Sequence, residues 1–188
     1  MVPQDSENAE RSKERLIDMA WLLNDLTSDL KTPVDLLVQL QPQMEASKQN
    51  FQSLSRLCIA SLIVNLCKFD EIIVHYGAEI NGFPDAIKAP LREVKIEIEK
   101  RGMYAFRSKY LAHAFSDVKG QPKKPLSFDD NVKSMMRVID YNLNPVTENV
   151  YRFGAWVYTQ SDETSVVHVI YNAVKYIEST VGGLGERR

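Results

Sequence analysis

The sequence of 188 residues contains only two cysteines and three histidines. Cys58 and Cys67 lie nine positions apart, which on a single helix places them on opposite faces, so they cannot form a disulfide with each other. We expect both to be buried, reduced thiols. Ligands at the spacings of a metal site are lacking too, so we expect no metal and no other cofactor.

Long apolar runs are also missing. Even the run LCIASLIVNLC (57–67) is interrupted by Ser61 and Asn65, and it is shorter than the roughly 20 residues that a membrane-spanning helix needs. Residues 1–15 are largely polar and lack the apolar core of a secretion signal. We therefore expect a cytoplasmic protein that has no membrane-spanning segment.

The sequence has no internal repeat and no alternation of apolar and polar residues long enough for a sheet. Apolar residues recur instead at spacings of three and four, as in Leu16, Met19, Leu23, Leu26 and Leu30 or Val167, Ile170, Val174, Ile177 and Val181. This spacing predicts an all-α protein, an up-and-down bundle of about five main helices. We expect a flexible segment over 1–12, one helical domain over 13–181 and a flexible tail over 182–188.

Prolines and capping residues indicate where the helices begin and end. Thr32 is a predicted cap, and Pro33 is predicted to be the first residue of a new short helix. A long central helix is expected over about 44–79, and another is expected to open near Pro90. Ser127 is a predicted cap that is followed by acidic residues in the first helical turn.

The net charge of −2 conceals an uneven distribution of charged residues. Residues 1–99 carry 10 basic and 16 acidic side chains, residues 100–124 carry 7 and 1, and residues 125–188 carry 6 and 8, which gives −6, +6 and −2. The basic segment suits phosphate binding, whereas the acidic remainder limits indiscriminate binding to nucleic acid. On charge alone, a solvated surface cluster is an equally good interpretation.

The basic segment contains FRSKYLAHAF (106–115), in which Arg107 and His113 are two groups suited to acid–base and phosphate chemistry. In a regular helix they lie about 120° and 9 Å apart and do not converge. They can meet if the helix is distorted near Gly102 or after Ala112, or if a second copy of the chain completes the site. The residues alone slightly favour a hydrogen-bonded core histidine.

This motif, after a long helix ending in CKFDEIIVHYG, resembles the HEPN superfamily of small α-helical bundles, in particular its AbiU2-like branch. That superfamily carries an arginine and a histidine a few residues apart, and here Arg107 and His113 enclose SKYLA. The resemblance implies a metal-independent endoribonuclease of toxin or phage-defence type. It also implies a homodimer in whose cleft both copies of the motif meet, with an antitoxin protein as a further candidate partner.

The chemistry that the resemblance implies fits these residue types. His113 would take the proton from an RNA 2′-hydroxyl, which attacks the adjacent phosphate, and Arg107 would stabilise the developing charge. The products would carry 2′,3′-cyclic phosphate ends. The candidate RNA-binding residues are Lys109, Lys119, Lys123 and Lys124.

Four further residues are candidates for supporting roles. Ser108 follows the arginine at a place where relatives often have asparagine, and it can still form hydrogen bonds. Tyr110 can contact a phosphate or base, although packing in the core or a dimer interface is favoured. Asp70 and Glu71 can orient Arg107 or His113 from a neighbouring helix, although an exposed acidic pair is favoured.

Two other functions stay open at this stage. A non-catalytic helical module that binds RNA, a nucleotide or an acidic protein would use the same basic segment without turnover. A purely structural dimer would bind no phosphate at all.

Overall fold

The computed structural model describes residues 4–111, 115–116, 124–125, 127–139 and 147–186. These residues are almost entirely helical, which confirms the prediction of an all-α protein. The elements are α1 (Gln4–Gln39), α2 (Gln41–Ala46), α3 (Lys48–His75), α4 (Gly77–Asn81), α5 (Asp85–Lys100), α6 (Met103–Phe106), the π-helix η1 (Arg107–Leu111), β1 (Phe115–Ser116), β2 (Lys124–Pro125), α7 (Phe128–Ile139), α8 (Thr147–Val157) and α9 (Val166–Val181).

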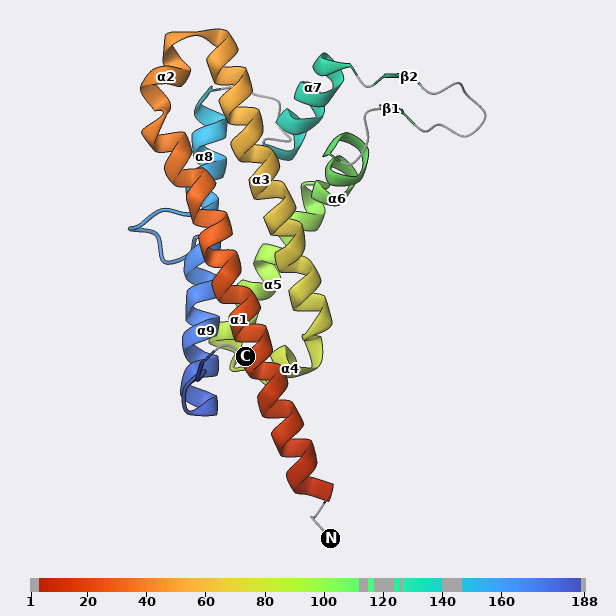
Figure 1. Ribbon diagram of the computed structural model, residues 1–188, viewed down its shortest axis with the longest axis vertical. Coiled ribbons are helices and arrows are strands. Elements are labelled where there is room, and N and C mark those ends of the chain that lie inside the picture. The colour runs from red at the N-terminus through yellow and green to blue at the C-terminus, as the bar shows by residue number, and fades with distance from the viewer. Residues whose placement is uncertain (1–3, 112–114, 117–123, 126, 140–146, 187–188) are drawn as a thin grey trace.

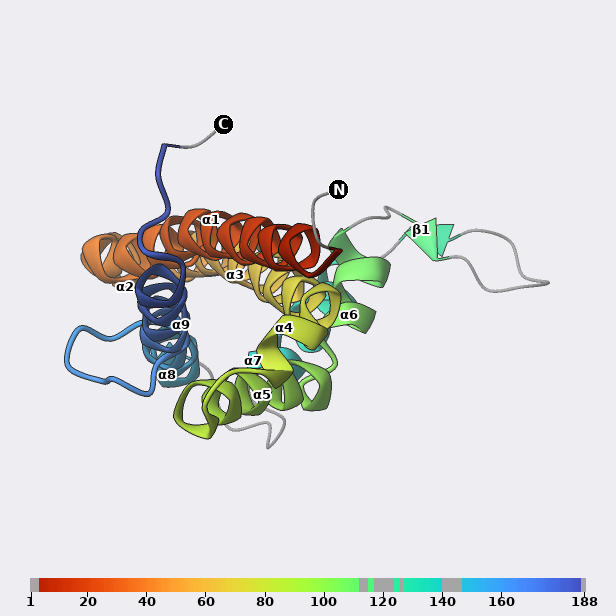
Figure 2. The ribbon, with the colours of Figure 1, turned by 90° about the horizontal axis from the view of Figure 1, so that it is seen from below.

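The longest helices, α1 and α3, run antiparallel along each other and form one side of the bundle (Figure 1). Helix α9 packs against α1, and α5 packs against both α3 and α9, so the four helices enclose the core in the end-on view (Figure 2). Both apolar stripes named from the sequence face this core. Its largest fully buried side chains are Phe69, Met19, Leu23, Leu30, Leu37, Met44, Ile59, Leu62, Ile63, Leu66, Leu91 and Ile98.

The predicted helix end at Thr32 is wrong, because α1 continues through Pro33 to Gln39. A proline inside a helix has no N–H to donate, so the carbonyl four residues before it loses its helical partner. Here that carbonyl belongs to Asp29, and the side-chain amide of the buried Asn65 on α3 donates to it over 3.2 Å. A side chain of the neighbouring helix therefore replaces the bond that Pro33 removes.

Other helix boundaries also differ from the predictions. Helix α5 opens at Asp85, not at Pro90, and the Pro84 carbonyl accepts the N–H groups of Ile87 and Lys88 in its first turn. The central helix was predicted over 44–79, but it divides into α2, α3 and α4.

Several shorter features flank the long helices. Residues 4–12 of the segment predicted as flexible belong to α1. The predicted cap Ser127 is confirmed, since its hydroxyl accepts the N–H of Asp130 over 3.0 Å. Strands β1 and β2 pair antiparallel over two residues each, a ladder too short to leave an alternating pattern in the sequence.

The chain is distorted where the basic segment begins. Gly102, between α5 and α6, adopts a left-handed conformation with φ 67°, which glycine reaches without steric cost. After one turn of α6, η1 begins at Arg107 with π-helical geometry. A distortion near Gly102, one of the two positions named from the sequence, is therefore present.

Candidate functional site

Arg107 extends from the first position of η1 toward the last turns of α3. Its Nη1 donates to Glu71 Oε1 over 2.8 Å, and its guanidinium carbon lies 5.2 Å from the centre of the Tyr104 ring. The hydrogen bond to Glu71 raises the pKa of Arg107, so the guanidinium stays cationic. The arginine side chain is 35% exposed and the glutamate 52%, so solvent reaches the ion pair.

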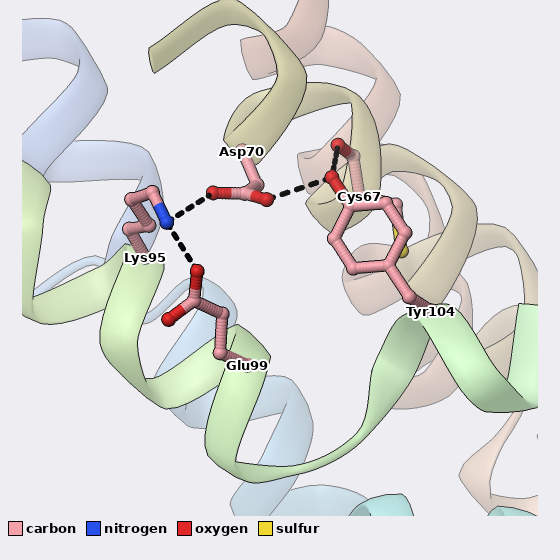
Figure 3. Close-up of polar contacts among 5 residues, drawn as sticks. All are labelled: Cys67, Asp70, Lys95, Glu99 and Tyr104. Carbon is pink, nitrogen blue, oxygen red and sulfur yellow. Dashed lines mark hydrogen bonds and ion pairs between the residues drawn. The ribbon is translucent and has the colours of Figure 1, made fainter. Parts of the chain in front are cut away.

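Asp70, the neighbour of Glu71, points inward and is only 5% exposed. The prediction of an exposed acidic pair is therefore wrong for this residue. Its Oδ2 accepts the Tyr104 hydroxyl over 2.7 Å, and the Lys95 ammonium lies 3.4 Å from its Oδ1 (Figure 3). Lys95 also pairs with Glu99 on the next turn of α5. A buried carboxylate needs such partners, because an unpaired buried charge is very costly.

Burial keeps the two other titratable groups beside Asp70 neutral. Burial, followed by the hydrogen bond to Asp70, raises the pKa of Tyr104, so the phenol remains a donor to the carboxylate. Burial also raises the pKa of the Cys67 thiol to about 11. Cys58 and Cys67 are both free and buried, as predicted.

The remaining residues of η1 lie on its other faces. Tyr110 is half-buried and stacks on Phe106, with their ring centres 5.5 Å apart, so it packs as its place on the apolar stripe predicted. The Lys109 ammonium lies 5.0 Å from the Tyr110 ring centre, and a hydrogen bond with Ser134 lowers the pKa of this tyrosine. Ser108 is exposed.

Arg101 belongs to the same basic segment but is used in a different way. Its Nη1 donates to the carbonyl oxygens of Ile139 over 2.6 Å and of Val138 over 3.0 Å, at the C-terminal end of α7. The last carbonyls of a helix have no partner within it, so a cation there is stabilising. The guanidinium also lies 5.1 Å from the Trp156 ring centre on α8. Arg101 therefore joins three helices.

Part of the predicted site lies outside the described residues, namely His113, Lys119 and Lys123. Lys124 belongs to β2, where it pairs with Ser116. Within the described residues, no group of three or more histidine, cysteine, aspartate or glutamate side chains could hold a metal ion. No helix in this part of the chain is both long and apolar enough to cross a membrane.

The structure thus brings Glu71 to Arg107, one of the arrangements that the sequence allowed. It also places Tyr104 and Lys95 around Asp70, which the sequence did not indicate. Tyr104 and Lys95 were not considered, although the spacing of three between Tyr104 and Arg107 on a helical segment is one that lets side chains meet. The part of Lys95 depends on α5 packing against α3. Nothing in the local sequence around Lys95 indicates that contact.

Comparisons with known proteins bear on the fold. No family model matches the chain, and no curated protein matches it. Among solved structures, the chain is similar to the integron cassette protein Vpc_cass2 from the mobile metagenome of V. paracholerae. The two share 20% sequence identity, with 88% of this chain and 96% of that chain covered and a TM-score of 0.68. At this level of identity the similarity concerns the fold alone.

Proposed function

We propose that this protein is a metal-independent endoribonuclease, of the toxin or phage-defence type that the HEPN resemblance implies. Arg107 and His113 would be its catalytic residues, in a homodimer. The observation that supports this proposal most is the π-helical geometry of η1, which begins at Arg107. Such segments are rare and are found frequently at functional sites.

The offset of about 120° between the arginine and the histidine holds for a regular α-helix, whereas the segment Arg107–Leu111 is π-helical. Glu71 engages only Nη1 through its hydrogen bond. The guanidinium is partly exposed, so a phosphate oxygen can reach it.

The proposed reaction is a transesterification. The neutral imidazole of His113 takes the proton of the 2′-hydroxyl, whose oxygen bonds to the adjacent phosphorus while the bond to the 5′-oxygen breaks. The leaving 5′-oxygen takes a proton from solvent water, which gives a 5′-hydroxyl and a 2′,3′-cyclic phosphate. Arg107 donates to the phosphate oxygens, where negative charge increases in the transition state. DNA lacks the nucleophile and would not be cleaved.

The test is incubation of the purified protein with total RNA in EDTA, followed by analysis of the fragment ends. We expect fragments with cyclic phosphate ends from the wild type and none from His113→Ala. His75→Ala is the matched control, because His75 is an exposed histidine at the end of α3, one helical turn after Glu71, and it has no part in the proposed reaction. Cleavage that persists in a folded His113→Ala protein would contradict the assignment.

A second candidate function is RNA binding without turnover. It is favoured by the ion pair with Glu71, because a neighbouring carboxylate offsets part of the charge that Arg107 would offer to a transition state. Salt-sensitive RNA binding by a wild-type protein that leaves the RNA intact would select this function. Arg107→Ala would then weaken binding, whereas His113→Ala would have little effect.

A further inference from the structure

The Tyr104 side chain contacts Arg107 with its ring and helix α3 with its hydroxyl group. One face of the ring supports the guanidinium, 5.2 Å from its centre. At the far end of the ring, the hydroxyl donates to Asp70 over 2.7 Å and lies 3.1 Å from the Cys67 carbonyl oxygen (Figure 3). Both acceptors belong to α3, so the ring is fixed to that helix although it is carried by α6.

The Asp70 carboxylate, which accepts the Tyr104 hydroxyl, is itself held in place by burial and by a second partner. It is 5% exposed, and it meets Lys95 on α5 through the oxygen that does not accept the tyrosine hydroxyl. The two carboxylate oxygens therefore face two different elements, α5 and α6. A carboxylate that is buried and paired in this way has a defined orientation, because rotation would cost one of its two partners.

Glu71 alone would hold Arg107 loosely. The ion pair is solvent-exposed on both sides, and an exposed pair of long side chains contributes little and orders them weakly. The ring contact adds a second restraint from a different direction. Arginine is suited to this arrangement, because its planar guanidinium stacks on an aromatic face while its edge remains available for hydrogen bonds.

We propose that Asp70 and Tyr104 are positioning residues for Arg107: Asp70 fixes the Tyr104 ring, and the ring fixes the plane in which the guanidinium meets a phosphate. This inference rests on the proposed ribonuclease function, in which Arg107 contacts the reacting phosphate. Neither Asp70 nor Tyr104 contacts RNA in this scheme. Lys95 supports the pair by balancing the buried carboxylate.

The chain contains a matched control for this arrangement. Arg15 on α1 lies 5.0 Å from the ring centre of Tyr76 and pairs with Glu79 on α4. The three residue types are the same, but no part of the proposed reaction involves them. Tyr76→Phe therefore removes a hydroxyl from an equivalent arginine-supporting ring outside the proposed site.

The first measurement is the rate of RNA cleavage by Tyr104→Phe, Tyr104→Leu, Asp70→Asn and the control Tyr76→Phe. Misplacement of a transition-state group by about 1 Å can cost about a hundredfold in rate. We expect kcat to fall about tenfold in Tyr104→Phe and Asp70→Asn, which keep the ring. We expect about a hundredfold fall in Tyr104→Leu, which removes it. KM should change less than about twofold, and Tyr76→Phe should match the wild type.

Tyr104→Phe keeps the ring volume, so a folded variant is available even if Asp70→Asn fails to fold. Folded variants of Tyr104 and Asp70 with wild-type kcat, beside an inactive Arg107→Ala, would overturn the positioning role and leave the ribonuclease function standing. A loss explained by a raised KM alone would also overturn it.

If the wild type does not cleave RNA, the proposed function fails, and the positioning role is then decided by a second measurement. This is the NMR order parameter of the Nε–H group of Arg107, with the Nε–H of Arg15 as the internal reference. We expect Tyr104→Phe and Asp70→Asn to lower the order of Arg107 and to leave Arg15 unchanged. An unchanged Arg107 order parameter would overturn the inference without reference to activity.

Discussion

Arg101 and Arg107 lie six residues apart in the same basic segment, and the fold uses them in opposite ways. The Arg101 side chain is 14% exposed and donates to two backbone carbonyls at the end of α7, while its ring contacts lie on α8. The Arg107 side chain is 35% exposed, pairs with Glu71 and lies over the Tyr104 ring. Arg101 joins helices, whereas Arg107 keeps part of its guanidinium available at the surface.

This difference shows that a count of positive charges overstates the surface available to a polyanion. The segment 100–124 carries seven basic side chains, but Arg101 is used within the bundle and Lys100 lies 3.7 Å from Glu97. Arg101 does not leave its backbone carbonyls to bind a phosphate, because the buried carbonyl oxygens would then have no hydrogen-bond donor. Arg107 can leave the exposed Glu71 carboxylate, because water then solvates that carboxylate.

The largest expected effect is on catalysis, through Arg107→Ala. Loss of a group that stabilises the transition-state charge typically lowers kcat by about 10²–10³-fold. The free energy of unfolding should change by less than about 1 kcal/mol, because the ion pair with Glu71 is exposed. RNA cleavage and urea unfolding of the same preparation measure both quantities. A strongly destabilised protein would show that Arg107 is structural, like Arg101.

Arg101→Met, which keeps an unbranched apolar stem, should lower stability and leave catalysis unchanged. The carbonyls of Val138 and Ile139 lose a charged donor and Glu97 loses its partner, so unfolding should become easier by about 2–3 kcal/mol. Cleavage per folded molecule should match the wild type. Urea unfolding at an unchanged m-value checks the first point. A stable Arg101→Met protein with reduced activity would reverse the assignments of the two arginines.

The sequence could not distinguish these arginines, because the partners of Arg101 lie 37 and 38 positions further on. The same limit explains the error at Pro33, whose missing hydrogen bond is replaced by Asn65 from another helix. Local rules treat a proline as a helix end because they count only bonds within the helix. Features that depend on nearby residues were predicted correctly, among them the apolar stripes and the cap at Ser127.

For the candidate site, the sequence named Arg107, and it named Glu71 as a residue that could orient it. Glu71 could be named because an acidic residue near a helix end is visible in the sequence. The inward direction of Asp70 could not be inferred, because it depends on the face of α3 that α5 and α6 cover. The π-helix was also not predicted, since no pattern in the sequence separates it from an α-helical turn.

A smaller effect is expected when the glutamates beside the two arginines are neutralised. Glu71→Gln removes a negative charge next to the proposed phosphate position, so RNA affinity should rise by about two- to fivefold at low salt. Its stability should change by less than about 0.5 kcal/mol. Glu97→Gln should leave RNA affinity unchanged and lower stability instead, because Glu97 pairs with the largely buried Arg101. Fluorescence anisotropy with a labelled RNA measures the affinities, and equal affinities for both variants would contradict the comparison.

The smallest effect concerns the salt dependence of RNA binding, and it tests the comparison most directly. For single-stranded RNA, each cation that neutralises a phosphate contributes about 0.7 to the slope of log K against log salt concentration. Arg107→Ala and Lys109→Ala should therefore each lower the slope by about 0.7, whereas Arg101→Met should leave it unchanged. The slope counts phosphate contacts and does not depend on turnover, so it applies to a nuclease and to a binding module alike. A reduced slope in folded Arg101→Met would mean that RNA binding draws this arginine out of the bundle, and the division between the two arginines would fail.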